Sequence, residues 1–290
     1  MLRTMRHVIL LLILGSFIFI SCQKEINFEF KGEDIPLDTT WHSLLLKIVN
    51  KSQGNPDSIV ISFKYDILKR LTEYDINGSH PSFTNENYKI IRNGQGNISK
   101  VIATIDDPSL SGVETTTYTI YYDASGTRCR YRIGDSKGPG TDSKDSTVYQ
   151  YDVKNKITQQ RIFQSGAGAS PYFEVIRRNF VYDGNNNLIE ATSYSDLVGS
   201  GNLQLDVVST FGYDSENNPM QYNNESFVIG RYLVGIPSNN NIVREIIQFP
   251  QNPVQNRIQD HSYTYNSSWF PLTDIITIAG SKQQNTYYYQ

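Results

Sequence analysis

The chain has 290 residues, with 26 Lys and Arg against 29 Asp and Glu, 12% aromatic residues and two cysteines. So few cysteines exclude a disulfide-stapled miniprotein, and the composition lacks the glycine content of a collagen. The near-neutral charge, without a basic run, argues against nucleic acid as a partner because phosphate backbones attract clustered lysine and arginine.

Residues 1–21 have the order of a secretory signal peptide. Arg3 and Arg6 precede an apolar stretch over residues 8–14, and Gly15, Ser16, the Phe and Ile residues at 17–20 and Ser21 follow before Cys22. The apolar run is too short to predict a membrane-spanning helix. The sequence therefore predicts export from the cytoplasm, with cleavage of the first 21 residues.

Ser21-Cys22 resembles the lipobox of bacterial lipoproteins, in which signal peptidase II cleaves before a diacylated cysteine. The family prefers Leu three residues before that cysteine, where this chain has Phe19. The resemblance implies that the mature chain is held to a membrane through an acylated Cys22, most often in the outer membrane. An ordinary cleaved signal, with Cys22 incidental, is the alternative. We expect a tether over residues 22–40 and one β domain over residues 41–290.

A Tyr-Asp motif recurs along the mature sequence. Complete or degenerate copies lie at residues 63–66, 90–93, 120–123, 149–152, 180–183, 211–214 and 263–266. Successive copies are 27, 30, 29, 31, 31 and 52 residues apart, and a decayed copy at residues 249–252 would divide the last interval. The spacing predicts eight units of similar length.

Each unit is typical of a β-hairpin. Residues before the Asp alternate between apolar and polar, as in Ile59 to Tyr65, and a second alternating run follows the turn. Asp, Asn and Gly at the turn bond their own backbone and tolerate positive φ. The residues expected to build the repeat are Tyr65, Asp66, Tyr122, Asp123, Tyr151, Asp152, Tyr182, Asp183, Tyr213, Asp214 and Tyr265.

This pattern resembles the YD repeats of the RHS family, whose unit reads roughly Tyr-x-Tyr-Asp-x-x-Gly-Asn-Leu. The closest copies are residues 183–188 and 96–98, and the resemblance covers most of residues 58–280. It implies that each repeat forms a β-hairpin, and it implies no catalytic residue. The chain is also similar to an uncharacterised lipoprotein family described as having a porin-like fold.

The hairpins predict an all-β fold, an antiparallel meander of roughly sixteen strands. Aromatic residues two positions apart, such as Phe63 and Tyr65, would form a buried ladder. Lys100, Glu190 and Asp274 interrupt the apolar rows that could face lipid, which argues against a transmembrane barrel. We expect a soluble barrel, closed or nearly closed to hide its edges, with a folded-over open sheet as the alternative.

Few residues offer catalytic or metal-binding chemistry. The mature chain has three widely separated histidines, His42, His80 and His261, so neither zinc nor another cofactor is expected. Acid pairs such as Asp106-Asp107 and Asp142/Asp145 are the candidates for a glycosidase. A calcium loop starting at Asp183 is less favoured than a hairpin turn.

Two further features concern the strand near residue 130. Cys129 alternates with Tyr131, which indicates a buried thiol, and Arg128, Arg130 and Arg132 are expected on a solvated outer face, open to an acidic partner. The sequence favours a lipid-anchored, non-enzymatic binding or scaffolding module at the cell envelope, with a glycan or protein ligand. The alternative is a carbohydrate-active hydrolase with paired carboxylates.

Overall fold

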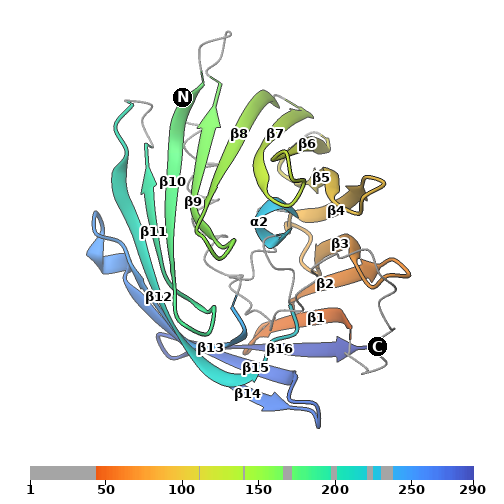
Figure 1. Ribbon diagram of the computed structural model, residues 1–290. Coiled ribbons are helices and arrows are strands. Elements are labelled where there is room, and N and C mark those ends of the chain that lie inside the picture. The colour runs from red at the N-terminus through yellow and green to blue at the C-terminus, as the bar shows by residue number, and fades with distance from the viewer. Residues whose placement is uncertain are drawn as a thin grey trace.

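The computed structural model describes residues 44–110, 112–139, 141–165, 172–196, 201–220, 225–229 and 238–290. Sixteen antiparallel strands form one closed barrel in which each strand pairs with its neighbours in sequence (Figure 1). Residues 1–43, which include the signal peptide, Cys22 and the tether expected over 22–40, lie outside the described residues.

The first eight strands are β1 (Leu45–Ser52), β2 (Ser58–Tyr65), β3 (Leu71–Gly78), β4 (Asn85–Arg92), β5 (Ile98–Asp106), β6 (Glu114–Tyr122), β7 (Cys129–Gly138) and β8 (Thr141–Tyr151). The other eight are β9 (Ile157–Gln164), β10 (Phe173–Tyr182), β11 (Leu188–Ser195), β12 (Gln204–Asn217), β13 (Asn240–Gln248), β14 (Arg257–Tyr265), β15 (Pro271–Ile278) and β16 (Ser281–Tyr289). A short helix, α2 (Glu225–Ile229), lies between β12 and β13 in sequence, and a 3₁₀ turn, η1 (Pro253–Gln255), precedes β14.

The barrel closes where its last strand meets its first. β1 pairs with β2 on one side and with β16 on the other, with Asn50 opposite Asn285. The amide of Gln290 donates to the carbonyl of Leu44 at 2.9 Å. The predicted closed meander is confirmed, and the open-sheet alternative is wrong. Closure removes the unpaired edges that would otherwise template association.

The alternation of the strands separates a buried inner face from an exposed outer face. Phe63, Ile120 and Tyr149 are buried, whereas Lys64 and Gln150, which lie between such positions, are exposed. Burial of the aromatic and aliphatic residues supplies most of the folding free energy, at roughly 25 cal/mol per Å² of apolar surface. The interior of the barrel is therefore its hydrophobic core.

The Asp or Asn of each motif builds the turn that follows it. Asp66 Oδ1 accepts from the amides of Leu68 and Arg70, both at 2.9 Å, and Lys69 between them has φ 60°. In the same way, one side-chain oxygen accepts from two backbone amides at Asn93, Asp152, Asp183 and Asn266. These turns, with the start of β1 and the end of β16, form one end of the barrel, which we call the Tyr-Asp rim.

A β-bulge follows these turns and changes which return-strand residues face inward. The register shifts between Lys64 and Tyr65, and equivalent shifts recur on β4, β6, β8, β10 and β14. The alternation that placed Asp274 in an outer row is wrong for this reason, because Asp274 is 1% exposed and shares the inner face with Ile276. A bulge adds one residue to one strand and so reverses the facing of the residues beyond it.

The long interval of the repeat results from an insertion. Residues 218–239 lie between β12 and β13, and α2 occupies the interior of the barrel (Figure 1). The decayed copy expected at residues 249–252 is instead the turn from β13 to β14, at the rim opposite the Tyr-Asp rim. The eighth unit ends at Tyr289, on the strand that closes the barrel.

Candidate functional site: the inner helix and its anchors

Tyrosine hydroxyls tie neighbouring strands together along the Tyr-Asp rim. Each donates to the carbonyl of a residue at or near the start of the preceding strand. The pairs are Tyr65 with Leu45 at 2.8 Å, Tyr151 with Cys129 at 2.8 Å, Tyr182 with Ile157 at 3.0 Å, Tyr213 with Leu188 at 2.6 Å, Tyr263 with Ile242 at 2.8 Å and Tyr289 with Pro271 at 2.7 Å. The motif tyrosine therefore satisfies a carbonyl near the bulge.

The seventh unit departs from this rule. Tyr263, two residues earlier, takes the carbonyl, and the motif residue Tyr265 donates instead to the carboxylate of Asp214. Asp214 Oδ1 accepts from the amides of Glu216 and Asn241. Asp214 thus joins the end of β12 to the start of β13 across the insertion.

Arg92 stands where the second unit lacks its tyrosine, and it anchors α2. Its Nη2 donates to the carbonyl of Leu71, the first residue of β3, at 3.3 Å. The same guanidinium forms a two-pronged ion pair with Glu225 of α2, at 2.7 and 2.9 Å. The Arg92 side chain is 8% exposed, and the hydrogen bond and charge of Glu225 raise its pKa against the opposing effect of burial. One substitution within the repeat therefore connects the barrel wall to the inner helix.

Three residues from β7, β8 and β10 hold the other end of α2. Arg132 Nη1 donates to the carbonyl of Val228 at 3.0 Å, and Tyr149 Oη donates to the carbonyl of Phe227 at 2.9 Å. The ring of Phe227 packs against Phe180, with centroids 5.0 Å apart. Cationic and hydroxyl donors at the last turn satisfy carbonyls that a short helix cannot bond internally.

The position of Arg132 corrects an expectation. Arg128, Arg130 and Arg132 do not share a solvated face, because Arg132 is 6% exposed inside the barrel and its guanidinium lies 4.3 Å from the ring centroid of Tyr118. The bulge after Cys129 turns Arg132 inward. Cys129 is buried as predicted, and burial raises the pKa of its thiol to about 12.

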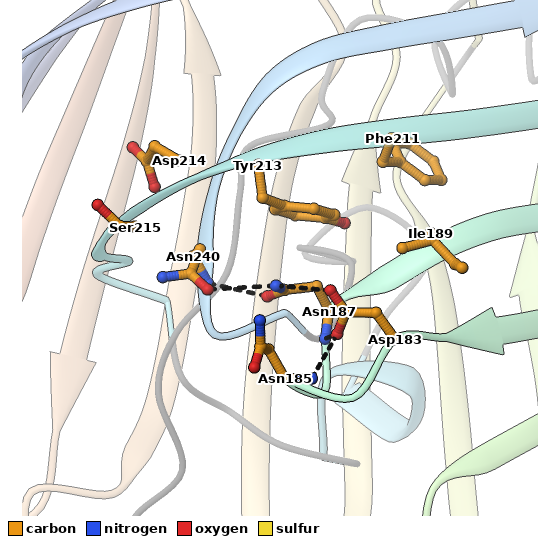
Figure 2. A pocket seen from close by; sticks show the side chains of 9 residues that line it. All are labelled: Asp183, Asn185, Asn187, Ile189, Phe211, Tyr213, Asp214, Ser215 and Asn240. Atoms are coloured by element: carbon orange, nitrogen blue, oxygen red, sulfur yellow. Dashed lines mark hydrogen bonds between the residues drawn. The ribbon is translucent and has the colours of Figure 1, made fainter.

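A second set of contacts fixes the return of the insertion to the wall at the Tyr-Asp rim. A hollow of about 460 Å³ lies there (Figure 2), lined by Asp183, Asn185, Asn187, Ile189, Phe211, Tyr213, Asp214, Ser215 and Asn240. Asn187 Oδ1 accepts from the amides of Asn239 and Asn240, at 2.7 and 3.1 Å. Asn187 Nδ2 donates to Asn240 Oδ1 at 3.2 Å. These polar groups bond one another, so the hollow is a seam between the turn at residues 183–187 and the start of β13.

The inner face of β14 to β16 and β1 carries a buried chain of polar groups. His261 Nδ1 lies 3.1 Å from a carboxylate oxygen of Asp274, and Asn285 donates to the same carboxylate at 3.1 Å. Asn50 in turn donates to Asn285 at 2.8 Å. Nε2 of His261 is buried without a hydrogen-bond partner. No local pattern predicts this pairing, because 13 residues and a hairpin separate His261 from Asp274.

Glu245 and Arg257 are the most costly groups on this wall. Glu245 is 0% exposed, and neither of its carboxylate oxygens has a hydrogen-bond partner, nor do Nε and Nη2 of Arg257. Burial raises the pKa of Glu245 to about 8, although the charge of Arg257 opposes this shift. Burial also lowers the pKa of Arg257. An unpaired carboxylate in such a place favours its neutral form.

The outer face of the barrel carries charged residues in ion pairs. Glu174 accepts from Arg161 and Arg177, with shortest distances of 2.7 and 2.8 Å, and these bonds, that from Arg177 foremost, lower its pKa to about 2. Lys64 lies 2.6 Å from Glu73 on the neighbouring strand. Arg244 and Asp260, 3.5 Å apart, repeat the pattern on β13 and β14. These outer ion pairs occur on both halves of the ring.

The acid pairs singled out for hydrolysis do not face one another across a cleft. Asp142 is exposed and pairs with Lys137, whereas Asp145 lies on the inner face of β8 beside Gly134, whose missing side chain leaves room for it. Asp107 accepts from the amide of Ser109 in a turn. Within the described ranges, no three His, Cys, Asp or Glu residues are grouped as metal ligands, and no helix there is long and apolar enough to cross a membrane.

Comparison with known proteins gives the fold. No protein-family model and no curated protein matches the chain. A porin-like protein from Bacteroides uniformis is similar in structure, with TM-score 0.53 and 13% identity over 85% of this chain and 98% of that one. A porin-like protein from Bacteroides vulgatus has TM-score 0.45 and 11% identity over 86% of this chain and 99% of that one. The expected porin-like fold is confirmed, and at such identity the likeness shows the fold alone.

Proposed function

We propose that this chain is a lipid-anchored protein of the bacterial cell envelope whose barrel stands beside the membrane and acts in binding or scaffolding without catalysis. The observation that carries the proposal is the charged outer face. Lys64, Glu73 and the cluster around Glu174 occupy positions that would face lipid in a spanning barrel. A basic residue on the lipid face costs roughly 2 to 4 kcal/mol at the bilayer midplane and less toward the interfaces, and Arg161 and Arg177 lie near the middle of their strands.

The anchor is the acylated Cys22 that the lipobox predicts. Each buried methylene contributes roughly 0.8 kcal/mol, so two or three acyl chains hold a water-exposed body at a membrane durably. The porin-like proteins of similar fold are consistent with an envelope location.

The inner helix supports a closed interior in place of an open channel. Arg92, Arg132 and Tyr149 hold α2 by four hydrogen bonds between 2.7 and 3.0 Å. The glycan or protein ligand expected from sequence would then meet an outer surface or a rim. The Tyr-Asp unit is, in this proposal, an RHS-type hairpin repeat whose tyrosine and aspartate have structural roles.

Two measurements test the location. Metabolic labelling with an alkyne fatty acid is expected to tag the wild-type chain and to leave Cys22→Ala untagged. The mature Cys22→Ala chain, made without its signal, is expected to remain in the supernatant after ultracentrifugation without detergent. Aggregation of a folded Cys22→Ala barrel that detergent alone reverses would contradict the proposal and would favour a spanning barrel.

A third measurement tests the closed interior. Wild-type protein offered to planar bilayers or to sucrose-loaded vesicles is expected to give no conductance steps and no swelling. A parallel experiment with a general porin provides the positive control. Steady conductance from the wild-type protein would show that α2 does not close the barrel.

A further inference from the structure

The Tyr-Asp rim presents apolar side chains at the tips of three turns. Ile67 and Leu68, between β2 and β3, are 96% and 66% exposed. Val153, between β8 and β9, is 98% exposed, and Trp269, between β14 and β15, is 58% exposed. Large apolar side chains at such exposure mark surfaces that contact a protein or a membrane when they occur together.

The three tips are distributed around the ring. Six strands separate the β2–β3 turn from the β8–β9 turn, and six more separate the latter from the β14–β15 turn. Three points spread around one end of a barrel define a plane, so one flat surface can contact all of them. A small folded partner would reach one tip at a time, whereas a bilayer reaches all three.

The turns hold these tips outward. Asp66, Asp152 and Asn266 each use one side-chain oxygen to accept two backbone amides, as described above. Trp269 has φ 62°, and its carbonyl accepts from the amide of Asn217 at 3.1 Å. The apolar tips therefore owe their exposure to a bonded backbone.

The charges at the tips suit an anionic surface. Lys69 and Lys154, next to Leu68 and Val153, are exposed, whereas Asp66 and Asp152 of the same turns are half-buried and bonded to amides. Each lysine near an anionic membrane contributes roughly 1 kcal/mol, and tryptophan is enriched at the level of lipid headgroups. At the opposite rim, the exposed apolar residues Val113, Tyr172 and Val254 share their end of the barrel with the exposed acids Asp106 and Asp142.

The chain from the anchor enters the barrel at the same rim. β1 begins at Leu45, whose carbonyl accepts from Tyr65, and the amide of Gln290 bonds the carbonyl of Leu44. Cys22 precedes Leu44 by 22 residues. An anchor at Cys22 therefore keeps the Tyr-Asp rim near the membrane.

We propose that the Tyr-Asp rim docks on the surface of an anionic phospholipid bilayer, with Ile67, Leu68, Val153 and Trp269 entering the headgroup region and Lys69 and Lys154 contacting phosphates. The membrane it would meet follows from the lipid-anchored function proposed above. The docking itself requires no acyl chain, so it can be measured on protein that lacks one.

The test uses the mature chain, residues 22–290, carrying Cys22→Ser, and sedimentation with vesicles of phosphatidylcholine alone or with 30% phosphatidylglycerol. Binding to the anionic vesicles is expected, weakened at least about tenfold by Ile67→Ser with Val153→Ser. Lys69→Gln with Lys154→Gln is expected to reduce the preference for anionic vesicles. Val254→Ser is the matched control, because Val254 is 91% exposed at the opposite rim, and it is expected to bind as the parent does.

Depth is measured by fluorescence. The chain has two tryptophans, so Trp41→Phe leaves Trp269 as the single reporter. Its emission is expected to shift to shorter wavelength with anionic vesicles and to be quenched by lipids brominated near the headgroup. Thermal unfolding of each variant shows that loss of binding does not come from loss of fold.

Three outcomes would overturn the docking proposal: no sedimentation with either vesicle, binding that Ile67→Ser with Val153→Ser leaves unchanged, or an equal loss from Val254→Ser. These outcomes are separate from the test of the anchor. Vesicle binding by the Cys22→Ser chain, together with no fatty-acid label on the wild-type chain, would support the docking and contradict the lipid anchor. A labelled wild-type chain, together with no vesicle binding by Cys22→Ser, would support the anchor and contradict the docking.

Discussion

The wall from β4 to β10 and the wall from β13 to β16 line one interior in two different ways. Arg92, Arg132 and Tyr149 on the first wall extend inward and bond α2. On the second wall, Glu245 and His261 are as deeply buried, but both carboxylate oxygens of Glu245 and Nε2 of His261 have no hydrogen-bond partner, whereas Arg92 lacks one only at Nε. Both walls come from the same repeat, so the hairpin unit does not decide what its inner positions do.

The first wall holds α2 in place, whereas the second buries polar groups without hydrogen-bond partners, which lowers the stability of the fold. A buried charge with a partner on a second element fixes that element in place, whereas an unpaired one shifts its pKa toward neutrality. The first arrangement suits a permanently seated helix. The second is expected to make the free energy of unfolding depend on pH.

The largest effect is expected from breaking the link between the first wall and α2. Arg92→Ala removes the ion pair with Glu225 and leaves the carbonyl of Leu71 without its donor. The free energy of unfolding, measured in urea, is expected to fall by about 3 kcal/mol. This is the low end for breaking a buried ion pair, because the Glu225 side chain is 39% exposed. Limited proteolysis within residues 218–239 is expected to speed up in this variant.

Arg92→Tyr is the matched variant, because it restores the side chain that the other units carry. It is expected to recover the bond to Leu71 and about 1 kcal/mol of stability, while the insertion stays as sensitive to protease as in Arg92→Ala. Equal protease resistance in Arg92→Tyr and wild type would show that Arg92 does not hold α2.

A smaller effect, with a defined pH dependence, is expected on the second wall. The pKa of Glu245 rises from about 4.5 unfolded to about 8 folded, so the folded state binds the proton more tightly. Stability is therefore full below pH 4.5 and falls as pH rises through 8. Glu245→Gln is expected to keep the stability that wild type loses between pH 5 and pH 8.

Urea unfolding of both proteins at four pH values measures this difference. Glu174→Gln is the control, because the pKa of Glu174 is lowered to about 2 and its contribution is lost only as pH falls from about 4.5 through 2. Parallel pH profiles for wild type and Glu245→Gln between pH 5 and pH 9 would contradict the assignment.

The smallest effect is expected from the tyrosine bonds, which the two walls share. Tyr182→Phe and Tyr289→Phe each remove one hydrogen bond to a carbonyl, at 3.0 and 2.7 Å, and keep the ring. Each is expected to cost about 1 kcal/mol, with the same value on both walls. A loss confined to one wall would mean that the tyrosine bonds depend on α2 after all.

Much of the fold could be predicted from the Tyr-Asp period, because alternation and turn chemistry are local. The sixteen strands, the closure and the turns at Asp66 or Asp183 belong to that class. The bulges could not be predicted in this way, since the register between Tyr122 and Cys129 depends on the paired strand. Strict alternation without the bulge places Arg132 on the outer face, whereas it lies on the inner face.

The inner helix and the polar wall were beyond sequence reasoning for a different reason. The bond from Arg92 to Glu225 crosses 133 residues, and no local pattern marks either partner. One signal was present, however. The second unit replaces Tyr with Arg92 and the interval before the seventh unit is too long, and the two irregularities belong to the same contact.

The junction of β16 with β1 makes the order of strands circular. A chain whose ends were joined there and reopened at the turn between β7 and β8 would keep all sixteen strand pairs, yet its leader would arrive at the opposite end of the cylinder. Relocating the ends would thus invert the barrel relative to the anchor proposed at Cys22 while leaving its architecture intact.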